Sequence, residues 1–403
     1  MEAEALERGA AGGDAAAFVL SRLPHPDDAA AGARAAYVDA ATGRALSFAG
    51  LRGAALSLAS ALRLGLGLRR GDAVLVALPS PDDDPLLLPP ILLGVLAAGC
   101  VAVVAAPAAA ANMSGVKIVV GAVAVGTLPL LLASRSPDPR ALSAEELMDG
   151  GDPAALDAVD ADGRPGPSEV ALVVYPSTGE RELMRHTDLV TAVAGAALPD
   201  EGRVCLASLP GWGADVHGAV ALLALGLPAA GATTVLLPPS SSDLRAAVAA
   251  HGATDVVATT EAAAALFAPA LPQGKLASLR RVTVVTPLED DARQAFRRRL
   301  SWVDLAEMGA ATAESPEQVQ VAPAPLLLVQ PDAAATQLKG KIPDQMPETS
   351  DATSLPPTEI FYQVSPLQKI RKTVLSDVFA KSVAGKFLRS NPVVCDKQAV
   401  SKL

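Results

Sequence analysis

Lys386 stands directly after Gly385 in the segment Ser382-Val-Ala-Gly-Lys-Phe-Leu-Arg389. Glycine adopts backbone angles that are closed to other residues, so the long cationic side chain that follows it can be presented into a cleft. Such an ammonium group suits the negative charge of a phosphate or a carboxylate. A solvated lysine at the start of a helix is the alternative that a Gly-Lys pair leaves open.

A second candidate for anion binding is a turn that follows an apolar run. The segment Val173-Val-Tyr-Pro-Ser177-Thr178-Gly179 leads from a predicted strand into a turn rich in hydroxyl groups and glycine. Turns of this kind direct backbone N–H groups and hydroxyls at phosphate oxygens. An ordinary turn at the end of a strand explains the same residues, so other motifs must decide between the two.

The elements that position these residues alternate between helices and strands. Ser47 can cap a helix with apolar residues at helical spacing, and the apolar run after Asp72 is typical of a strand. Further strands are predicted over residues 255–260 and 281–286, and a charged helix over 289–299. This alternation predicts an α/β fold whose mostly parallel sheets are flanked by helices.

Residues 85–116 carry no charged side chain, which raises a membrane span as an alternative because about 20 apolar residues suffice to cross a bilayer. Pro89-Pro90, Gly94 and Pro107 interrupt the run, and three aspartates rather than basic residues precede it. We therefore predict a buried helix followed by a strand, and no membrane span.

Composition narrows the function classes. The chain has 403 residues, half of them hydrophobic, and a net charge of −10, which argues against a nucleic-acid partner. Cys100, Cys205 and Cys395 are odd in number and far apart, so neither a disulfide framework nor a structural metal is expected. The charged N-terminus lacks the apolar core of a secretory signal.

Lysine usage divides the chain. Only Lys117 and Lys275 precede residue 339, whereas eight lysines occur in the last 65 residues, and a Pro-rich segment lies at the change. Such a shift in composition is typical of a domain border. We predict a large N-terminal domain over residues 1–316 and a small C-terminal domain over residues 317–403.

The C-terminal segments resemble a known family. Phe361-Tyr-Gln-Val-Ser-Pro-Leu-Gln-Lys-Ile-Arg-Lys372 and Gly385-Lys-Phe-Leu-Arg389 look like the C-terminal domain of the adenylate-forming acid:CoA ligases, in particular the plant 4-coumarate:CoA ligase-like branch. The resemblance implies that the small domain is α+β and that Lys386 is catalytic. It also implies that residues 1–316 are the AMP-binding domain.

The resemblance extends into the large domain. The turn at Ser177 is similar to the family's phosphate loop, Leu209-Pro-Gly-Trp212 to its acyl-pocket motif, and Trp302-Val-Asp-Leu-Ala-Glu-Met-Gly309 to the approach to a nucleotide motif. The residues that it implies for ATP binding are Ser177, Thr178, Gly179, Thr312 and Lys386; those for the acyl pocket are Trp212 and His217, and the Mg²⁺ contact is Glu314.

The chain departs from the family in two places. The phosphate-loop turn is shorter and lacks the second glycine and the lysine, so that Arg181 is the only nearby cation. The segment Gln318-Val-Gln-Val-Ala-Pro323 resembles a motif that in the family lies well downstream of the position of Thr312. Roughly 100 residues or more, the size of a subdomain, are therefore absent between the two motifs. A degenerate, weakly active or inactive relative, or an incomplete sequence, is therefore the alternative hypothesis.

The resemblance implies a two-step reaction. ATP and a carboxylic acid give an acyl-adenylate, and CoA then gives the acyl-CoA thioester, with ATP, CoA and Mg²⁺ as the cofactors. The acid itself, hydroxycinnamic or fatty, is left open. The tail Ser401-Lys402-Leu403 matches a peroxisomal address read by the import receptor, so we expect a peroxisomal location.

Overall fold

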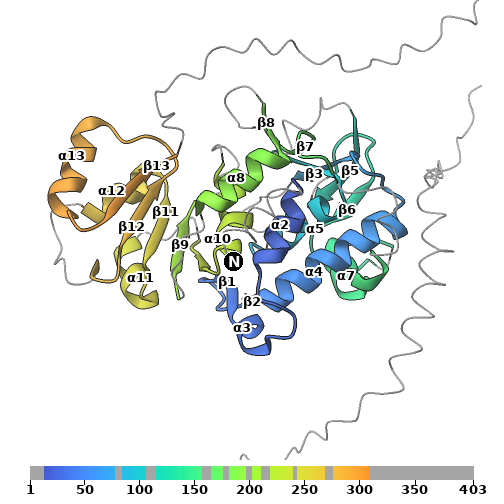
Figure 1. Cartoon of the computed structure of the whole chain (residues 1–403), viewed down its shortest axis with the longest axis horizontal. Helices are drawn as coiled ribbons and strands as arrows, with labels where there is room; N and C mark the ends of the chain where they lie inside the picture. Colours follow the sequence, from blue (N-terminus) through green and yellow to red (C-terminus); the bar gives the residue numbers. More distant parts are fainter. Residues whose placement is uncertain are drawn as a thin grey trace, which may run out of the picture.

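The computed structural model describes residues 13–77, 84–105, 115–122, 124–138, 140–156, 165–175, 181–196, 202–209, 218–238, 243–267 and 276–308. Two sheets of mostly parallel strands form the framework of this part, with helices packed against them (Figure 1). The predicted α/β fold of the large domain is thereby confirmed. The predicted small domain, residues 317–403, lies outside the described residues.

The first sheet has seven strands. In spatial order they are β13 (Asp304–Glu307), β12 (Arg281–Val284), β11 (Asp255–Ala258), β9 (Val204–Ser208), β10 (Thr233–Leu236), β1 (Ala35–Asp39) and β2 (Ala45–Ser47). Strands β1 and β2 form an antiparallel hairpin, and every other pair in this sheet is parallel.

The second sheet has six strands. Their order is β6 (Leu130–Leu132), β5 (Val116–Gly121), β3 (Ala73–Ala77), β4 (Val101–Ala105), β7 (Val170–Tyr175) and β8 (Glu182–Arg185). Here the β7–β8 hairpin is antiparallel and the remaining pairs are parallel. The sequence analysis predicted mostly parallel sheets but neither their number nor the order of their strands.

The helices fall into two groups by the core that they join. The central core, which both sheets share, receives side chains from α2 (Ala15–Arg22), α4 (Phe48–Ser60) with its π-helical continuation (Ala61–Gly65), α5 (Leu88–Ala97), α7 (Ala144–Gly150), α8 (His186–Ala196) and the α9–η5–α10 segment (Ala219–Ala229). The outer face of the first sheet is covered by α11 (Leu244–His251), α12 (Thr260–Phe267) and α13 (Asp290–Arg299). A short helix, α3 (Ala29–Ala33), precedes β1.

The inner strands of the two sheets are apolar on both faces. In β3, Val74 and Val76 point into the central core, whereas Leu75 lies in a cluster on the opposite face. In β9, Cys205 belongs to the central core and Leu206 to the outer one. Parallel strands buried on both sides are expected to read as continuous apolar runs, and the sequences of β3, β4 and β7 do so.

Local signals in the sequence operate as predicted. Ser47 caps α4, because its side-chain oxygen accepts a hydrogen bond of 3.0 Å from the N–H of Gly50. The uncharged run 85–116 contains α5 and β4, and α5 is buried along nearly its whole length. No described helix reaches the length and apolarity that crossing a bilayer requires.

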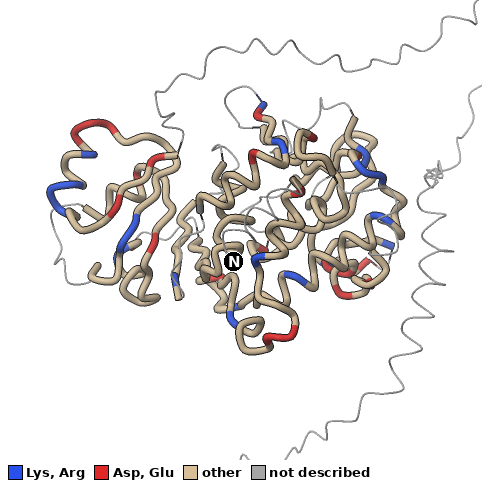
Figure 2. The backbone as a smooth tube through the Cα atoms, in the orientation of Figure 1, with Lys and Arg blue, Asp and Glu red and all other residues tan. Residues whose placement is uncertain are grey.

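Charged residues lie mostly at the ends of elements. Helix α13 has Asp290 and Asp291 in its first turn and three arginines in its last, which complements the helix dipole (Figure 2). At the amino ends of two neighbouring strands, the guanidinium of Arg203 binds both carboxylate oxygens of Asp255, at 2.6 and 3.1 Å, and both side chains are buried. This pair fixes the start of β9 to the start of β11.

Helices α4 and α5 approach closely at Gly94. A Cβ atom at this position would lie 2.9 Å from the carbonyl oxygen of Ala55 and 3.0 Å from a methyl carbon of Leu58. The contact with a backbone atom means that one helix must shift to admit even a methyl group. Gly94 is therefore the residue that permits this packing.

We expect Gly94→Ala to lower the free energy of unfolding by about 1–3 kcal/mol, since the overpacking outweighs the gain in helix propensity. The matched control is Gly53→Ala in α4, where no heavy atom lies within 4 Å of the added carbon. That variant should be neutral or up to ~1 kcal/mol more stable. Chemical denaturation of the two variants and the wild type measures the difference, and equal effects would contradict the close-packing argument.

Candidate functional site

The carboxyl ends of four strands lie at one level of the first sheet. Ser208, the last residue of β9, is in register with Ala258 of β11, which is in register with Val284 of β12, and that residue with Glu307 of β13. Ligands of open parallel sheets bind beyond the carboxyl ends of the strands. This edge is therefore the first candidate for a site.

Two of the predicted motifs leave the sheet from this edge. Residues 210–217 follow β9, and residues 309–316 follow β13. The described residues that border them are in contact, because a Cβ atom on Gly218 would lie 3.2 Å from the terminal methyl carbon of Met308. The N–H of Met308 also donates a 2.8 Å hydrogen bond to the carbonyl oxygen of Val284. The fold thus brings the borders of the two motifs together.

The predicted phosphate turn lies between the strands of the β7–β8 hairpin. Val174 is in register with Glu182, so the strands are paired almost up to residues 176–180. Tyr175, the last residue of β7, is also in register with Ala105 of β4. Arg181 is exposed immediately before β8. The prediction that a strand leads into this turn is confirmed.

The predicted site residues themselves lie outside the described residues, and their roles stay predictions. They are Ser177, Thr178 and Gly179 in the β7–β8 connection, Trp212 and His217 after β9, and Thr312, Glu314 and Lys386 after β13.

A pair of hydroxyl groups at the same edge was missed by the sequence analysis. Thr260 and Thr286 each follow the end of a strand by two residues, and their side-chain oxygens are 2.6 Å apart. The Thr260 hydroxyl also lies 3.1 Å from the carbonyl oxygen of Thr286. The signal in the sequence was a threonine at equal distance after two parallel strands, since such positions meet at one edge.

Glu307 ends β13 at this edge, but its carboxylate is engaged. The guanidinium of Arg293 in α13 binds both of its oxygens, at 2.8 and 2.9 Å. This bidentate hydrogen bonding lowers the pKa of Glu307 below its ordinary value, against the opposing effect of burial. Glu307 therefore holds helix α13 to the last strand rather than offering a metal ligand.

Metal-binding groups are sparse in the described residues. No cluster of three or more His, Cys, Asp or Glu side chains suited to a metal ion occurs there. Mg²⁺ in nucleotide sites is held by one or two carboxylates together with substrate phosphates, so a dense cluster is not required.

Cys100 and Cys205 are free and buried, and burial raises the pKa of both thiols, that of Cys100 to about 12.

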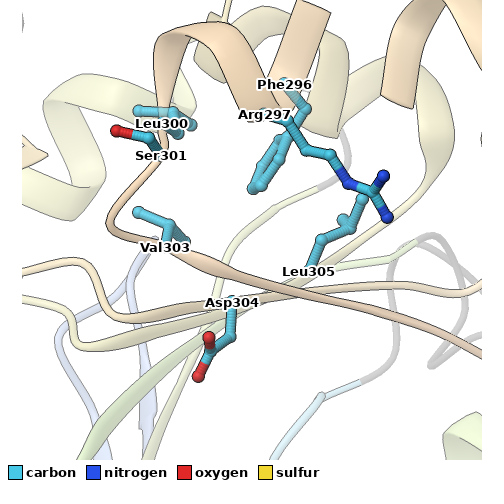
Figure 3. A pocket seen from close by; sticks show the side chains of 7 residues that line it. All are labelled: Phe296, Arg297, Leu300, Ser301, Val303, Asp304 and Leu305. Atoms are coloured by element: carbon cyan, nitrogen blue, oxygen red, sulfur yellow. The ribbon is translucent and has the colours of Figure 1, made fainter. Parts of the chain in front are cut away.

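A depression on the first sheet lies at the opposite end of β13. Its lining includes Phe296, Leu300 and Val303, and Asp304, the first residue of β13, lies at its border (Figure 3). Asp304 is in register with Arg281, the first residue of β12. The depression therefore belongs to the amino edge of the sheet and is separate from the candidate site.

Comparison with known proteins identifies the family. The sequence profile of the family described as "AMP-binding enzyme" matches residues 26–316. The chain belongs to the AMP-binding enzyme family. The match covers the whole described part from residue 26 onwards and ends after the segment that leaves β13.

Two rice proteins (Oryza sativa subsp. japonica) place this AMP-binding chain near the 4-coumarate–CoA ligase-like branch. 4-coumarate--CoA ligase-like 3 is 30% identical over 308 residues, which are 66% of this chain and 50% of the relative. 4-coumarate--CoA ligase-like 8 is 46% identical over 85 residues, which are 21% of this chain and 13% of that protein. The matched region is thus half or less of each relative's length.

Solved structures share the fold. A benzoate CoA ligase from Burkholderia xenovorans LB400 matches with a TM-score of 0.55 at 23% identity, over 73% of this chain and 60% of the ligase. ATP-bound MatB from Rhodopseudomonas palustris matches with a TM-score of 0.56 at 19% identity, over 72% of this chain and 59% of that protein. At these identities the likeness concerns the fold alone.

Glu307→Gln should lower the thermal midpoint at pH 7, because an amide removes the negative charge and one of the two acceptors that Arg293 binds. The pKa of Glu307 is lower in the folded protein than its ordinary value of 4.5, so the stabilisation is present above pH 4.5 and is lost as the pH falls through the lowered pKa. The midpoints of wild type and variant should therefore converge in acid.

Thermal unfolding between pH 3 and 8 measures this convergence. Glu289→Gln is the matched control, because Glu289 is exposed beside the same helix and makes no capping hydrogen bond with its side chain. A gap between Glu307→Gln and wild type that stays constant down to pH 3 would contradict the assignment.

Proposed function

We propose that the chain is an ATP-dependent carboxylate:CoA ligase. The family match carries the proposal, and the fold supports it, since the borders of the segments with Trp212, His217, Thr312 and Glu314 meet at the carboxyl edge of one sheet. The substrates would be ATP, CoA and a carboxylic acid. Whether the acid is hydroxycinnamic or fatty is left to experiment.

In the first step, a carboxylate oxygen attacks the α-phosphorus of ATP, and the bond to pyrophosphate breaks. This brings two anions together, so cationic and hydrogen-bonding groups that act where charge develops lower the barrier. We assign this role to Lys386, with Ser177, Thr178 and Gly179 as phosphate donors and Thr312 beside them. A bound Mg²⁺, with Glu314 as its protein contact, would supply further charge neutralisation.

In the second step, the CoA thiol attacks the acyl carbon of the adenylate, and AMP leaves as the acyl-CoA thioester forms. Trp212 and His217 are the proposed acyl-pocket residues. The small domain, residues 317–403, would carry Lys386 and move relative to the large domain between the two steps. The boundary at residue 316 coincides with the end of the family match and is part of the proposal.

A degenerate relative is the second candidate. The chain spans half the length of the rice protein 4-coumarate--CoA ligase-like 3, and the sequence between β7 and β8 lacks the second glycine and the lysine of the family's phosphate loop. Interactions of this kind act mainly in the transition state, so their loss would abolish catalysis more readily than folding.

Acid-dependent exchange of pyrophosphate into ATP separates the two candidates. The ligase predicts exchange with at least one member of a panel of hydroxycinnamic and fatty acids, and a loss of about 10²–10³-fold in Lys386→Ala. Lys381→Ala is the matched control from the same segment and should retain exchange. Exchange absent with every acid, in a protein that is folded, would favour the degenerate relative.

A peroxisomal location is also proposed, and the import receptor is the proposed partner. The support is the tail Ser401-Lys402-Leu403, which is read only when Leu403 is the last residue. A fluorescent protein fused to the N-terminus should give punctate fluorescence that coincides with a peroxisomal marker. Addition of two glycines after Leu403 should make the fluorescence diffuse, and unchanged puncta would contradict the proposed address.

A further inference from the structure

Three chain segments meet at the base of the β7–β8 hairpin, at the end remote from residues 176–180. The N–H of His186, directly after β8, donates to the carbonyl oxygen of Glu169 at 3.0 Å, and the next N–H donates to Pro167 at 3.1 Å. Gly13, before α2, packs so closely on Pro167 that a Cβ atom would lie 2.5 Å from the proline ring. Gly13 has a φ of 63°, which favours glycine.

The imidazole of His186 completes the N-terminal cap of α2. Its Nδ1 atom accepts a 3.1 Å hydrogen bond from the N–H of Ala15, the first residue of the helix. The Asp14 carboxylate accepts the next two helix N–H groups, those of Ala16 and Ala17. Only 2% of the His186 surface is exposed, so water cannot readily replace the ring as the acceptor.

This hydrogen bond requires a particular protonation state. Nδ1 accepts only when it carries no proton, so the neutral ring is assigned with its proton on Nε2. In the imidazolium form, Nδ1 becomes a donor and faces the N–H of Ala15. The positive end of the α2 dipole adds to the repulsion. Proton uptake by His186 is therefore incompatible with this contact.

The charged groups around the ring come from three elements. Asp14 lies at the start of α2, with a carboxylate oxygen 3.9 Å from Nδ1, Glu169 precedes β7, and Arg70 precedes β3. Burial is the largest effect and lowers the pKa of His186, while the two carboxylates raise it and Arg70 lowers it further. Arg70 also binds both carboxylate oxygens of Glu169, which reduces that opposing charge.

We propose that the neutral imidazole of His186 is a positioning group that latches helix α2 onto the base of the β7–β8 hairpin, and that its protonation opens the latch. Because β7 and β8 flank residues 176–180, opening should weaken ATP binding in mildly acidic solution. This second consequence rests on the proposed function. The latch itself does not.

Hydrogen exchange of the full chain between pH 5 and 8 tests the latch, after correction for the pH dependence of intrinsic exchange. Below the ordinary pKa of 6.5, protection of peptides from α2 should fall about tenfold per pH unit until the lowered pKa is reached. Peptides from α12 provide the internal reference, since this helix packs in the outer core and contains no histidine. If protection of α2 in the wild type does not depend on pH, that result alone overturns the proposal.

His186→Asn removes the titration and keeps an oxygen acceptor near the position of Nδ1. Its α2 protection should be independent of pH over the same range. His251→Asn is the matched control, because His251 is an exposed residue at the end of α11, and it should keep the wild-type pH dependence. The same pH dependence in His186→Asn as in the wild type would overturn the assignment to His186.

Calorimetric titration with ATP at pH 5.5 and 8 tests the functional consequence. The affinity of the wild type should be lower at pH 5.5, and the ratio of affinities at the two pH values should be smaller in His186→Asn. No ATP binding at either pH, together with the expected exchange behaviour, would refute the proposed function and leave the latch intact. ATP binding with the same ratio in both proteins would refute the link between latch and nucleotide.

Discussion

Burial of both faces of the parallel strands is the constraint on which the rest of this structure depends. Side chains such as Val74 and Leu75 enter different cores from neighbouring positions of one strand. Strands of this kind have no free face for polar chemistry, so polar groups collect at strand ends and in turns. Within the described residues, the candidate site at the carboxyl edge of the first sheet follows from this confinement.

The two ends of the strands use their polar groups differently. At the amino ends, Arg203 and Asp255 form a buried ion pair whose partners satisfy each other and leave little for a ligand. At the carboxyl ends, the Thr260–Thr286 hydroxyl pair lies at the edge where Glu307 is held by Arg293. The Arg293–Glu307 pair fixes α13 to β13, whereas the threonine pair joins the segments that follow β11 and β12.

The local elements could be predicted because their signals are local. The cap at Ser47, the apolar helix and strand within residues 85–116, and the acidic start and basic end of α13 depend on a few neighbouring residues. The pairing of strands could not be predicted in this way. Alternation of helices and strands says nothing about which strand lies beside which, and β1 pairs with β10 across almost 200 residues of chain.

The sequence by itself determined the family resemblance, the α/β class of the large domain and the residue types that could bind phosphate and activate a carboxylate. The tertiary structure alone decided that the borders of two motif segments meet at Gly218 and Met308. It also decided that His186 caps a helix 171 residues earlier in the chain. The physical reason is that composition and periodicity are encoded along the chain, whereas a hydrogen bond or a packing contact forms only between groups that folding has brought together.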